Sequence, residues 1–455
     1  AYHLQQEAAD RAIPLRVVLL EADERLGGKI LTEQVDGFTI EGGPDCFIRQ
    51  KPWATELANK IGLQDELLPT NDHQRKTFVL TKGRLTPLPD GVMLIIPTRI
   101  MPFALSSLIS LPGKIRMGMD WFIPQFKGPG DESVGDFVRR RLGREALEKI
   151  AEPLMSGIHV SDPEKQSLLA TFPRFRALEQ KHGSLIRGML AQRKAARNQP
   201  HANGKTPSIF LSLREGVAQL TQRLEAALAG VQICKGTRVV QLEKIQQGYR
   251  LTLDRGEPIL ADAVILAIPA FHAAELFEPL QPQIARQLTA IPYVSTATVS
   301  LAFRKQDIRK PFLGFGFVVP RTEKRDISAC TWTSFKFDHR APDDYLLLRG
   351  FIGGPGKEEL VDLDDESMVQ VVRRELRSIL ELDAEPVLSR VYRWRKANPQ
   401  YEVGHLDRVK ALFADCRTHT PGVILTGSAY EGVGIPDCVL QGKKAATEAM
   451  EYLQR

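Results

Sequence analysis

The first residues with a possible chemical role directly follow a short apolar run near the start of the chain. Residues 17–20 are apolar, and Glu21 follows them directly. A carboxylate at the end of the second strand of a dinucleotide-binding βαβ unit accepts hydrogen bonds from ribose hydroxyls. Arg25 and the pair Gly27-Gly28 come next, and glycine lets the backbone approach a ligand because it has no Cβ. These residues predict a nucleotide site, with a buried strand ending in a solvated acid and a tight turn as the alternative.

The phosphate-binding turn of such a unit lies about 20 residues before the acid. Counting back from Glu21 places it at or just before Ala1, and residues 2–9 then match the remainder of the first helix. We therefore expect the first strand and the glycine-rich loop to be missing. The backbone N–H groups of that loop, which would face the pyrophosphate, would then be missing as well. The chain as written is expected to bind its nucleotide weakly.

A second glycine-rich turn lies near the other end of the chain. Residues 423–426 are a buried apolar run, glycines follow at 427, 432 and 434, and a helix is expected from near Ile435. The N-terminus of a helix attracts an anion or a ring carbonyl. Two such signals at opposite ends predict one cofactor domain built from both termini. A cofactor long enough to touch both favours a flavin dinucleotide.

Composition narrows the class of protein. The chain has 455 residues, 43% hydrophobic and 25% charged, which is ordinary for a globular protein of two or three domains. A net charge of +6 fits an acidic ligand or an anionic membrane surface, and no zinc spacing, aromatic-basic repeat or basic tail predicts nucleic acid as a partner. The five cysteines form no C-x-x-C, so neither a disulfide framework nor a metal site is predicted, and a reducing cytoplasm is the simplest location.

The elements between the two ends change in type along the chain. A hairpin is expected over residues 77–88, helices dominate from about 100 to 197, and strands dominate from 290 to 395. Ser133 with Asp136 predicts a helix start, and a second helix is expected over residues 145–155.

Three segments of this middle region have alternative interpretations. Residues 139–141, three arginines, predict a solvated face, with contact to anionic lipid as the alternative. Residues 193–207 are polar and broken by Pro and Gly, which predicts a surface linker. The bulky apolar residues from 91 to 113 predict either an ordinary helical core or a patch that docks on a membrane surface or lines a pocket.

An ordered set of motifs gives a family resemblance over essentially the whole chain. The set comprises residues 21–28, 43–47, 78–89, 132–143, 152–163, 183–186, 261–269, 337–342, 399–405 and 425–442. This set resembles the flavin-containing amine oxidase superfamily, and within it the porphyrinogen oxidase family of haem synthesis. Residues 331–334 and 347–350 are similar to the Gram-positive branch, whose members prefer coproporphyrinogen III over protoporphyrinogen IX.

The resemblance implies an α/β fold with three domains. A Rossmann-like FAD-binding domain would comprise residues 1–72, 206–272 and 405–455. A substrate domain with a mixed sheet would comprise residues 73–100 and 273–404, and a helical, membrane-associating domain residues 101–205. The implied enzyme uses FAD to remove six hydrogens from a porphyrinogen in three two-electron steps, and dioxygen reoxidises the flavin to give hydrogen peroxide.

The resemblance also implies cofactor residues along the chain. Glu21 would hold the adenosine ribose, Arg25, Gly27 and Gly28 would face the pyrophosphate, and Val239 would contact the adenine through its backbone. The remaining cofactor-binding residues would be Gly42, Gly43, Trp394, Gly427, Gly432, Val433 and Gly434. The flavin carries the redox chemistry, and the protein orients it against the substrate.

Asp45 is the predicted catalytic residue. A buried carboxylate facing several pyrrole N–H groups would position the substrate and stabilise positive charge as hydride leaves; a simple turn residue after Pro44 is the alternative. Many relatives carry Asn here and an Arg where this chain has Thr77. A propionate would then be held by one of four cations, or all four are ordinary surface charges: Arg75, Lys76, Arg174 and Arg176. Gly157, Phe315 and Thr331 complete the predicted substrate site.

Two other functions stay open at this stage. One is an amine oxidase or carotenoid desaturase of the same superfamily, although Trp394 and Tyr430 alone do not make the aromatic cage of an amine oxidase. The other is a flavin-binding partner of haem enzymes without turnover of its own. The expected partners are a porphyrinogen and dioxygen, and a homodimer and a peripheral contact with the inner face of the cell membrane are compatible with them.

Overall fold

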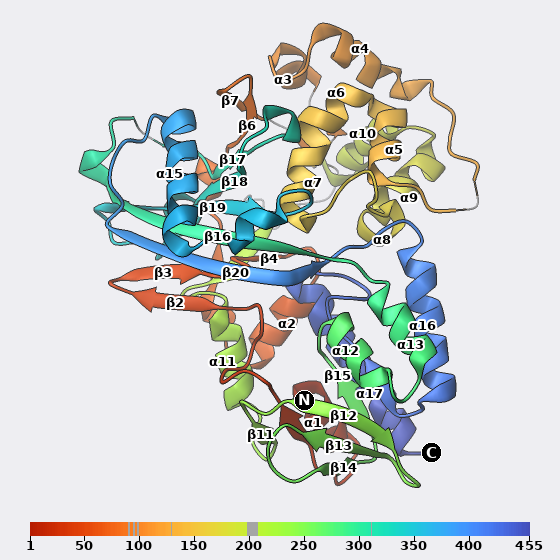
Figure 1. The fold of residues 1–455 in the computed structure, drawn as a ribbon. Helices are drawn as coiled ribbons and strands as arrows, with labels where there is room; N and C mark the ends of the chain where they lie inside the picture. The colour runs from red at the N-terminus through yellow and green to blue at the C-terminus, as the bar shows by residue number, and fades with distance from the viewer. Residues whose placement is uncertain (90–91, 94–95, 98–99, 129, 198–207, 311) are drawn as a thin grey trace.

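The computed structural model describes residues 1–89, 92–93, 96–97, 100–128, 130–197, 208–310 and 312–455. Its elements gather into three groups in Figure 1: a helical group at the top, a large sheet in the middle, and an α/β group at the bottom. Both chain termini lie in the bottom group, so residues from the two ends of the sequence fold together there.

The middle group is built around a mixed seven-stranded sheet. Its order is β20-β16-β19-β18-β17-β6-β7, and neighbours are antiparallel except for β17 and β6, which are parallel. In that order the strands are Leu388–Pro399, Tyr293–Arg304, Tyr345–Gly353, Ile327–Trp332, Gly316–Val318, Thr77–Thr81 and Arg84–Pro87. The hairpin expected over residues 77–88 is therefore the edge of this sheet.

The two faces of the sheet differ because successive side chains of a strand point to opposite sides. On one face, Val299 and Leu301 of β16 share a hydrophobic core with helix α15 (Asp365–Leu380), which lies over the sheet in Figure 1. On the opposite face, Thr298 and Ser300 are buried polar residues. This second face is the one that meets the α/β group.

The bottom group contains two separate parallel sheets of two strands each. β1 (Val18–Leu20) pairs with β11 (Gln232–Cys234), and β15 (Val264–Leu266) pairs with β21 (Val423–Leu425). An antiparallel sheet of β12 (Val239–Lys244), β13 (Tyr249–Leu253) and β14 (Ile259–Ala261) lies beside them. The other strands outside the large sheet and the helical group are β2 (Thr32–Val35), β3 (Phe38–Glu41), β4 (Phe47–Ile48), β5 (Leu67–Pro69) and β10 (Phe210–Leu213).

Helices cover these strands, as the exposed surfaces of parallel sheets require. α1 (Tyr2–Asp10) lies against α17 (Ile435–Leu453), the first helix of the chain against the last. Ala445 and Ala449 of α17 pack on Ile424 of β21. The other helices here are α2 (Trp53–Lys60), α11 (Ala218–Ala226), α12 (Ala270–Phe277), α13 (Pro282–Thr289) and α16 (His405–His419).

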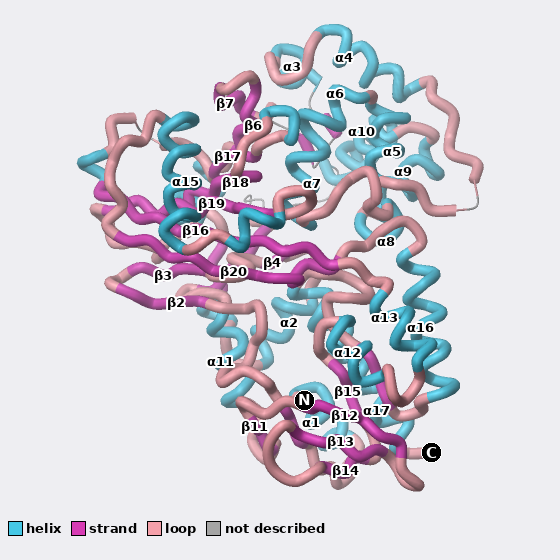
Figure 2. Tube along the Cα trace, viewed as in Figure 1, coloured by secondary structure: helices cyan, strands magenta, loops and turns pink. Residues whose placement is uncertain are grey.

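The top group is helical, as Figure 2 shows by colour, apart from the short pair β8 (Val92–Met93) and β9 (Ile96–Pro97). Its helices are α3 (Ile100–Leu105), α4 (Leu111–Gly118), α5 (Val134–Leu142), α6 (Arg144–Ala146), α7 (Glu152–His159), α8 (Leu168–Thr171), α9 (Pro173–His182) and α10 (Leu185–Arg197). The predicted cap of α5 is present, because Ser133 Oγ accepts a hydrogen bond from the Asp136 N–H at 2.9 Å. The helix expected over 145–155 contains a π-helical turn, Leu147–Ala151.

Two predictions about this group are corrected. The arginine run is not a solvated face: Arg141 is fully buried and forms an ion pair with Asp120 at 3.0 Å, and even Arg139, the most exposed of the three, is only 42% exposed. Helical spacing turns the third arginine of the run inward. The expected linker over residues 193–207 begins later than predicted, because α10 continues to Arg197; residues 198–207 lie outside the described residues.

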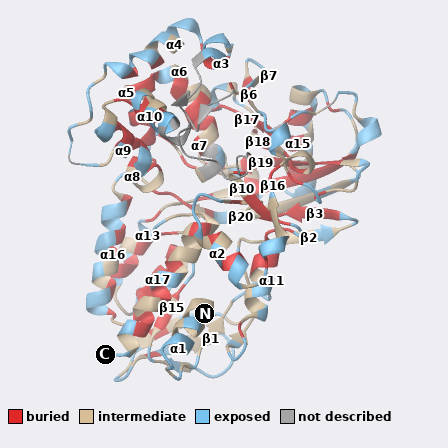
Figure 3. Cartoon of the chain, turned by 180° about the vertical axis from the view of Figure 1, so that it is seen from behind, coloured by how far each residue is buried: buried red, intermediate tan, exposed pale blue. Residues whose placement is uncertain are grey.

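The apolar segment divides into core and surface. Phe103, Leu108 and Ile109 belong to the helical core, whereas a set of seven residues, here called the apolar patch, is between 41% and 83% exposed: Met101, Leu105, Leu111, Ile115, Met119, Trp121 and Phe122. Figure 3 shows the exposed surface of α3 and α4 at one end of the molecule. Of the predicted segment, residues 91, 94, 95, 98 and 99 lie outside the described residues. No helix in the described part of the chain has the length and apolar character needed to cross a bilayer.

Candidate active site

The glycine turn after β3 is held against the polar face of the large sheet. The Gly42 carbonyl accepts hydrogen bonds from Trp394 Nε1 at 2.7 Å, Arg349 Nη2 at 3.1 Å and Thr298 Oγ1 at 3.3 Å. A Cβ on Gly43 would lie 1.8 Å from the Lys29 carbonyl oxygen, so no other residue fits there. The turn is thus fixed between the sheet and the loop that follows Gly28.

The loop at residues 21–30 is held by its own polar groups. Glu21 Oε1 accepts from the Asp23 N–H at 3.0 Å, and the Arg25 guanidinium donates to the carbonyls of Gly28 and Ile30. Gly28 has a φ of +53° and no heavy atom within 4 Å of the place of a Cβ. Arg25 therefore shapes the turn, and the backbone of Gly28 lies open.

The adenosine end of the predicted site is brought together by β11 and β12. The Thr237 N–H donates to the Glu21 carbonyl at 2.8 Å, and the Gly236 N–H donates to the Asp23 carbonyl at 2.9 Å. Val239 follows at the start of β12 and packs on the same hydrophobic cluster as Leu20. Glu21 and Val239, over 200 residues apart in sequence, thus share one edge of the α/β group.

The C-terminal glycine turn leads into α17 as predicted. Gly434 is its N-cap, the Gly432 N–H donates to Tyr401 Oη at 2.8 Å, and Gln441 Nε2 donates to the Gly432 carbonyl at 3.1 Å. Gly427 has no heavy atom within 4 Å of the place of a Cβ, and the buried Thr426 hydroxyl beside it has no hydrogen-bond partner among the described residues. Open backbone next to an unpaired buried hydroxyl fits a polar group of a cofactor at this turn.

These segments converge although they are distant in sequence. Lys29 donates to the Ala397 carbonyl of β20, the strand that also carries Trp394. Lys51, after β4, forms an ion pair with Asp437 in the first turn of α17 at 2.6 Å. The structure therefore brings the loop after Gly28, the Gly42-Gly43 turn, Trp394 and the start of α17 around one place, with Glu21 and Val239 further along the α/β group.

Asp45 lies four residues after β3 and is paired with a lysine. Lys336 Nζ lies 2.7 Å from Asp45 Oδ2 and 3.5 Å from Cys46 Sγ. Burial alone would raise the pKa of Asp45, but the charges of Lys336 and Arg349 outweigh it and hold that pKa well below its ordinary value. Asp45 is therefore ionised in the folded protein.

A buried network holds the backbone of Asp45. Ser212 Oγ of β10 donates to the Asp45 carbonyl at 2.7 Å and accepts from Arg340 Nη2 at 2.8 Å. Arg340 is itself buried, 3.9 Å from Glu41. Burial raises the pKa of Glu41 to about 7 despite the opposing charge of Arg340. Carbonyl and carboxylate of Asp45 are thus fixed from two directions.

Three of the predicted substrate residues lie near one another. α7, which carries Gly157, packs on β17 and β18; a Cβ on Gly157 would lie 3.9 Å from Val318. Phe315 precedes β17 and is half-buried, and Thr331 of β18 pairs with Arg349 of β19 in the sheet register. Directly paired residues share a face of a sheet, so Thr331 lies on the side of the Gly42-Gly43 turn.

The four cations considered as propionate anchors lie in two places, Arg75 and Lys76 directly before β6 and Arg174 and Arg176 on α9. Arg75 follows the short turn before β6 and is exposed, and Arg174, also exposed, lies over the Phe175 ring at the start of α9. Arg176 is buried and forms ion pairs with Glu132 at 2.8 Å and Glu179 at 3.2 Å, so its charge is already satisfied. Of the cations near the site, sequence reasoning missed Lys336 and Arg349. Neither residue stands in a local pattern that indicates its place near Asp45.

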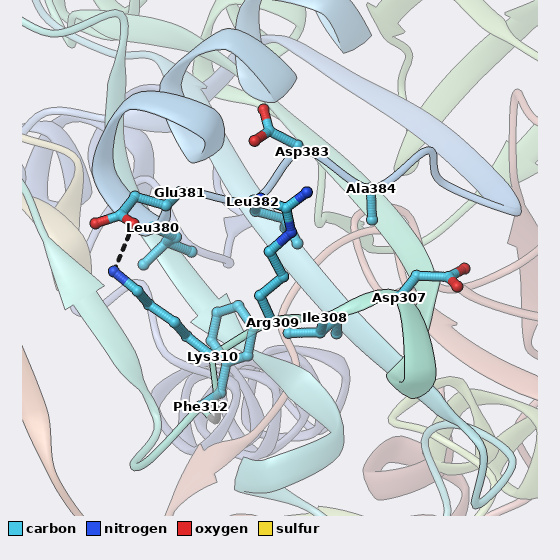
Figure 4. A pocket seen from close by; sticks show the side chains of 10 residues that line it. All are labelled: Asp307, Ile308, Arg309, Lys310, Phe312, Leu380, Glu381, Leu382, Asp383 and Ala384. Carbon is cyan, nitrogen blue, oxygen red and sulfur yellow. Dashed lines mark ion pairs between the residues drawn. The ribbon is translucent and has the colours of Figure 1, made fainter.

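Two hollows are lined by none of the residues predicted for the active site. One of about 380 Å³ is lined by residues including Asp162, Lys165, Tyr293, Arg321 and Tyr401, where the three groups of elements meet. The other, of about 170 Å³, lies between the end of β16 and the end of α15. Figure 4 shows that both charged and apolar side chains line it, with Lys310 and Glu381 paired at 2.5 Å.

Comparison with known proteins decides the family. The sequence profile described as flavin containing amine oxidoreductase matches residues 1–450. The chain belongs to this family. Its members are flavin-containing, in agreement with the predicted cofactor, and the resemblance inferred from the motifs is confirmed. The α/β fold with a mixed sheet is the fold of the family.

Individual relatives are similar over nearly their whole length. A coproporphyrinogen III oxidase of Bacillus subtilis (strain 168) is 40% identical over 453 residues, covering 100% of this chain and 95% of that protein. A chloroplastic protoporphyrinogen oxidase of Nicotiana tabacum is 31% identical, covering 96% and 82%. A crystal structure from Exiguobacterium sp. 255-15, named as a candidate protoporphyrinogen oxidase, is 35% identical with a TM-score of 0.87, covering 100% and 96%.

Proposed function

We propose that this protein is an FAD-dependent oxidase that converts a porphyrinogen to the porphyrin in haem synthesis, with dioxygen as the final electron acceptor. Coproporphyrinogen III is the proposed substrate. The names of the relatives from Bacillus subtilis and Staphylococcus aureus, 40% and 36% identical, support this choice. So does the carboxylate at Asp45, because the resemblance gives this position an Asp in the coproporphyrinogen-preferring branch, whereas many other relatives carry Asn.

The observation that carries the proposal is the placement of Asp45. Its ionised side chain is 18% exposed, at the end of the turn that begins with Gly42 and Gly43. A fixed, partly exposed carboxylate beside a proposed flavin site suits a substrate that offers several pyrrole N–H donors and gains positive charge when it loses hydride. A polyene, which has no N–H groups, offers no such match.

The aromatic cage of an amine oxidase finds no support in the two aromatic residues considered for it. Tyr430 is fully buried, with its ring 5.5 Å from that of Phe413. Trp394 donates its indole N–H to Gly42. The buried Tyr430 presents no free ring face as one half of a cage, which favours the porphyrinogen over an amine.

The residues at the converging segments are proposed to hold FAD. Glu21 and Val239 would take the adenosine, Arg25, Gly27 and Gly28 the pyrophosphate, and Gly42, Gly43, Trp394 and residues 427–434 the flavin end. When bound, FAD accepts a hydride from the substrate and passes the electrons to dioxygen. The chain's own part is to fix the ring with the Gly42-Gly43 turn and the start of α17, and to orient the macrocycle through Asp45, Gly157, Phe315 and Thr331.

The three groups of elements support the proposed domain division, with residues 1–72, 206–272 and 405–455 around FAD, 73–100 and 273–404 around the substrate, and 101–205 as the helical domain. The cytoplasmic location, a homodimer, and peripheral membrane contact through the helical domain remain predictions, and the apolar patch is the proposed surface for the membrane contact.

An anaerobic mixing experiment tests the function. The protein loaded with FAD is mixed with coproporphyrinogen III, with protoporphyrinogen IX or with a primary amine, and the flavin absorbance is followed. We expect the first to bleach the flavin fastest, with porphyrin and hydrogen peroxide forming once air is admitted. Bleaching by the amine alone would identify an amine oxidase, and no bleaching by any reductant would indicate a binding protein without turnover.

A further inference from the structure

The ion pair between Lys336 and Asp45 has a consequence that goes beyond the proposed function and rests on it. The two side chains are only 15% and 18% exposed, and the ammonium lies 2.7 Å from the carboxylate. Lys336 comes from α14 (Thr333–Lys336), directly after β18, while Asp45 belongs to the α/β group. The pair therefore joins the two groups of elements that enclose the proposed site.

Each charged group near Asp45 either favours or disfavours the ionised form of its carboxyl. Lys336 and Arg349 favour the carboxylate, whereas Glu41 disfavours it, and Arg340 lies within electrostatic reach behind Ser212. The Cys46 thiol also favours the carboxylate by hydrogen bonding. Among these groups Lys336 alone forms a direct ion pair with the Asp45 side chain.

Lys336 itself is fixed from both sides. Its ammonium lies 5.2 Å from the centre of the Phe337 ring and 5.9 Å from that of Phe210, and its backbone carbonyl accepts from the Asn71 N–H at 3.0 Å. Burial would lower the pKa of Lys336, but the negative charge of Asp45 outweighs it and raises that pKa. The lysine thus stays charged throughout the range in which enzymes work.

We propose that Lys336 is a positioning residue that keeps Asp45 an oriented anion, so that Asp45 acts on the porphyrinogen as an electrostatic partner and not as a proton acceptor. In each two-electron step one C–H bond of a bridging carbon breaks, its hydride leaves for the cofactor and one proton is released; over the three steps two of these protons come from pyrrole N–H groups and one from the fourth bridging carbon. A carboxylate paired with an ammonium is a weak base, so each proton passes to water. Asp45 stabilises the positive charge that the macrocycle carries after the hydride has left and before the proton is released.

Four enzymes test this proposal: wild type, Lys336→Met, Lys336→Arg and the double variant Asp45→Asn/Lys336→Met. kcat/KM for coproporphyrinogen III is measured from mildly acidic to mildly basic pH. We expect Lys336→Met to gain a new acid limb, at least about one pH unit above any acid limb of the wild type. The reason is that loss of an opposite charge at this distance raises a carboxyl pKa by about that amount. Lys336→Arg should keep the wild-type profile, and the double variant should lose the new limb.

Two outcomes overturn the proposal. One is a Lys336→Met profile that is lowered evenly at every pH, as a merely structural lysine would give. The other is a new limb that persists in the double variant, which would assign it to another group.

Infrared titration of the wild-type protein gives a second readout that needs no turnover. The Asp45 carboxyl band, identified by its absence in Asp45→Asn, should show the ionised form throughout the assayed range, and a band that protonates within it contradicts the ion pair. If wild-type protein oxidises no porphyrinogen, the proposed function fails while this titration still tests the pair. If Asp45→Asn alone oxidises it normally, the role of Asp45 fails.

Discussion

The indole N–H of Trp394 donates to the carbonyl of Gly42 at 2.7 Å, joining β20 of the large sheet to the glycine turn of the α/β group. The two residues are more than 350 positions apart in the chain. The same carbonyl also accepts from Arg349 and Thr298, so three donors from the sheet fix one peptide group. The backbone beside the proposed flavin is thereby held by side chains of the neighbouring group of elements.

Replacing Trp394 by Phe tests this contact. The change keeps an aromatic ring but removes the donor, and a lost hydrogen bond of this kind costs about 1 kcal/mol, so we expect FAD to bind about fivefold more weakly. Fluorescence titration of the apoprotein with FAD measures the affinity. Trp332→Phe is the matched control, because the buried Trp332 Nε1 has no partner among the described residues. Equal losses in the two variants would show that ring packing and not the hydrogen bond matters.

The position of Gly28 gives a second test of the cofactor site. Gly28 and Gly62 are both exposed, have φ values of +53° and +78°, and have no heavy atom within 4 Å of a Cβ. Alanine at either place should cost about 1–2 kcal/mol of stability, since the left-handed conformation disfavours a Cβ. Only Gly28→Ala should weaken FAD binding, by about tenfold or more, because its Cβ would enter the space proposed for the pyrophosphate. If both variants bind FAD like wild type, the pyrophosphate does not lie at Gly28.

Two neighbouring arginines of α5 should differ sharply in their contribution to stability. Arg141 is fully buried with Asp120, whereas Arg139 is 42% exposed in its pair with Asp136. Removing Arg141 as Arg141→Met leaves an unpaired buried carboxylate and should lower the free energy of unfolding by about 3–5 kcal/mol. Arg139→Met should cost less than about 1 kcal/mol. Urea unfolding of both variants measures these differences. Similar losses of unfolding free energy in the two variants would mean that Arg141 is accessible to water.

Acid should destabilise the protein through His405. The ring is buried, lies 3.9 Å from that of Tyr401 and has its Nε2 2.8 Å from the Tyr430 carbonyl. Burial lowers the pKa of His405 to about 4. An unfolded histidine has a pKa of about 6.5, so the unfolded chain binds the proton first and stability falls as the pH drops through the interval between the two values.

The size of this effect is measurable by difference. Between about pH 7 and about pH 5 the His405 contribution should be about 2 kcal/mol. His405→Gln removes the titration, so the loss of unfolding free energy over that interval should be smaller in the variant by this amount. Exposed His419, at the end of the same helix, serves as the control, and His419→Gln should behave like wild type. An unchanged pH dependence in His405→Gln would show that the ring is already protonated or solvated when folded.

The sequence was a good guide wherever one periodic segment decides its own structure. β1 with Glu21 at its end, the β6–β7 hairpin, the cap at Ser133 and the start of α17 at Ile435 all lie where local patterns predict them. Contacts between distant segments were not accessible in this way. Arg141 was predicted to be solvated because its ion-pair partner Asp120 lies outside its helix, and a run of three arginines does not indicate such a distant partner. Lys336 was missed because nothing near it in the chain indicates its pairing with Asp45.

The apolar patch gives the last prediction. Phe122 and Leu105 are 83% and 81% exposed, a large apolar surface for one end of a globular protein. The nearby cations are engaged within the protein, because Lys114 donates to the Ala104 carbonyl and Arg116 to the carbonyls at the end of α5. Binding to a bilayer should therefore depend mainly on apolar contact and only weakly on anionic lipid.

Vesicle cosedimentation measures this binding. The double variant Leu105→Glu/Phe122→Glu should lose most of its binding to vesicles of mixed neutral and anionic lipid, while keeping FAD affinity and porphyrinogen oxidation in solution. Leu313→Glu is the matched control, since Leu313 is 61% exposed but lies beside β17, away from the patch. Equal binding by wild type and the double variant would contradict a membrane role for the patch. Binding that rises steeply with the anionic fraction would assign the contact to charge, because each basic residue near such a surface contributes about 1 kcal/mol whereas apolar burial is indifferent to lipid charge.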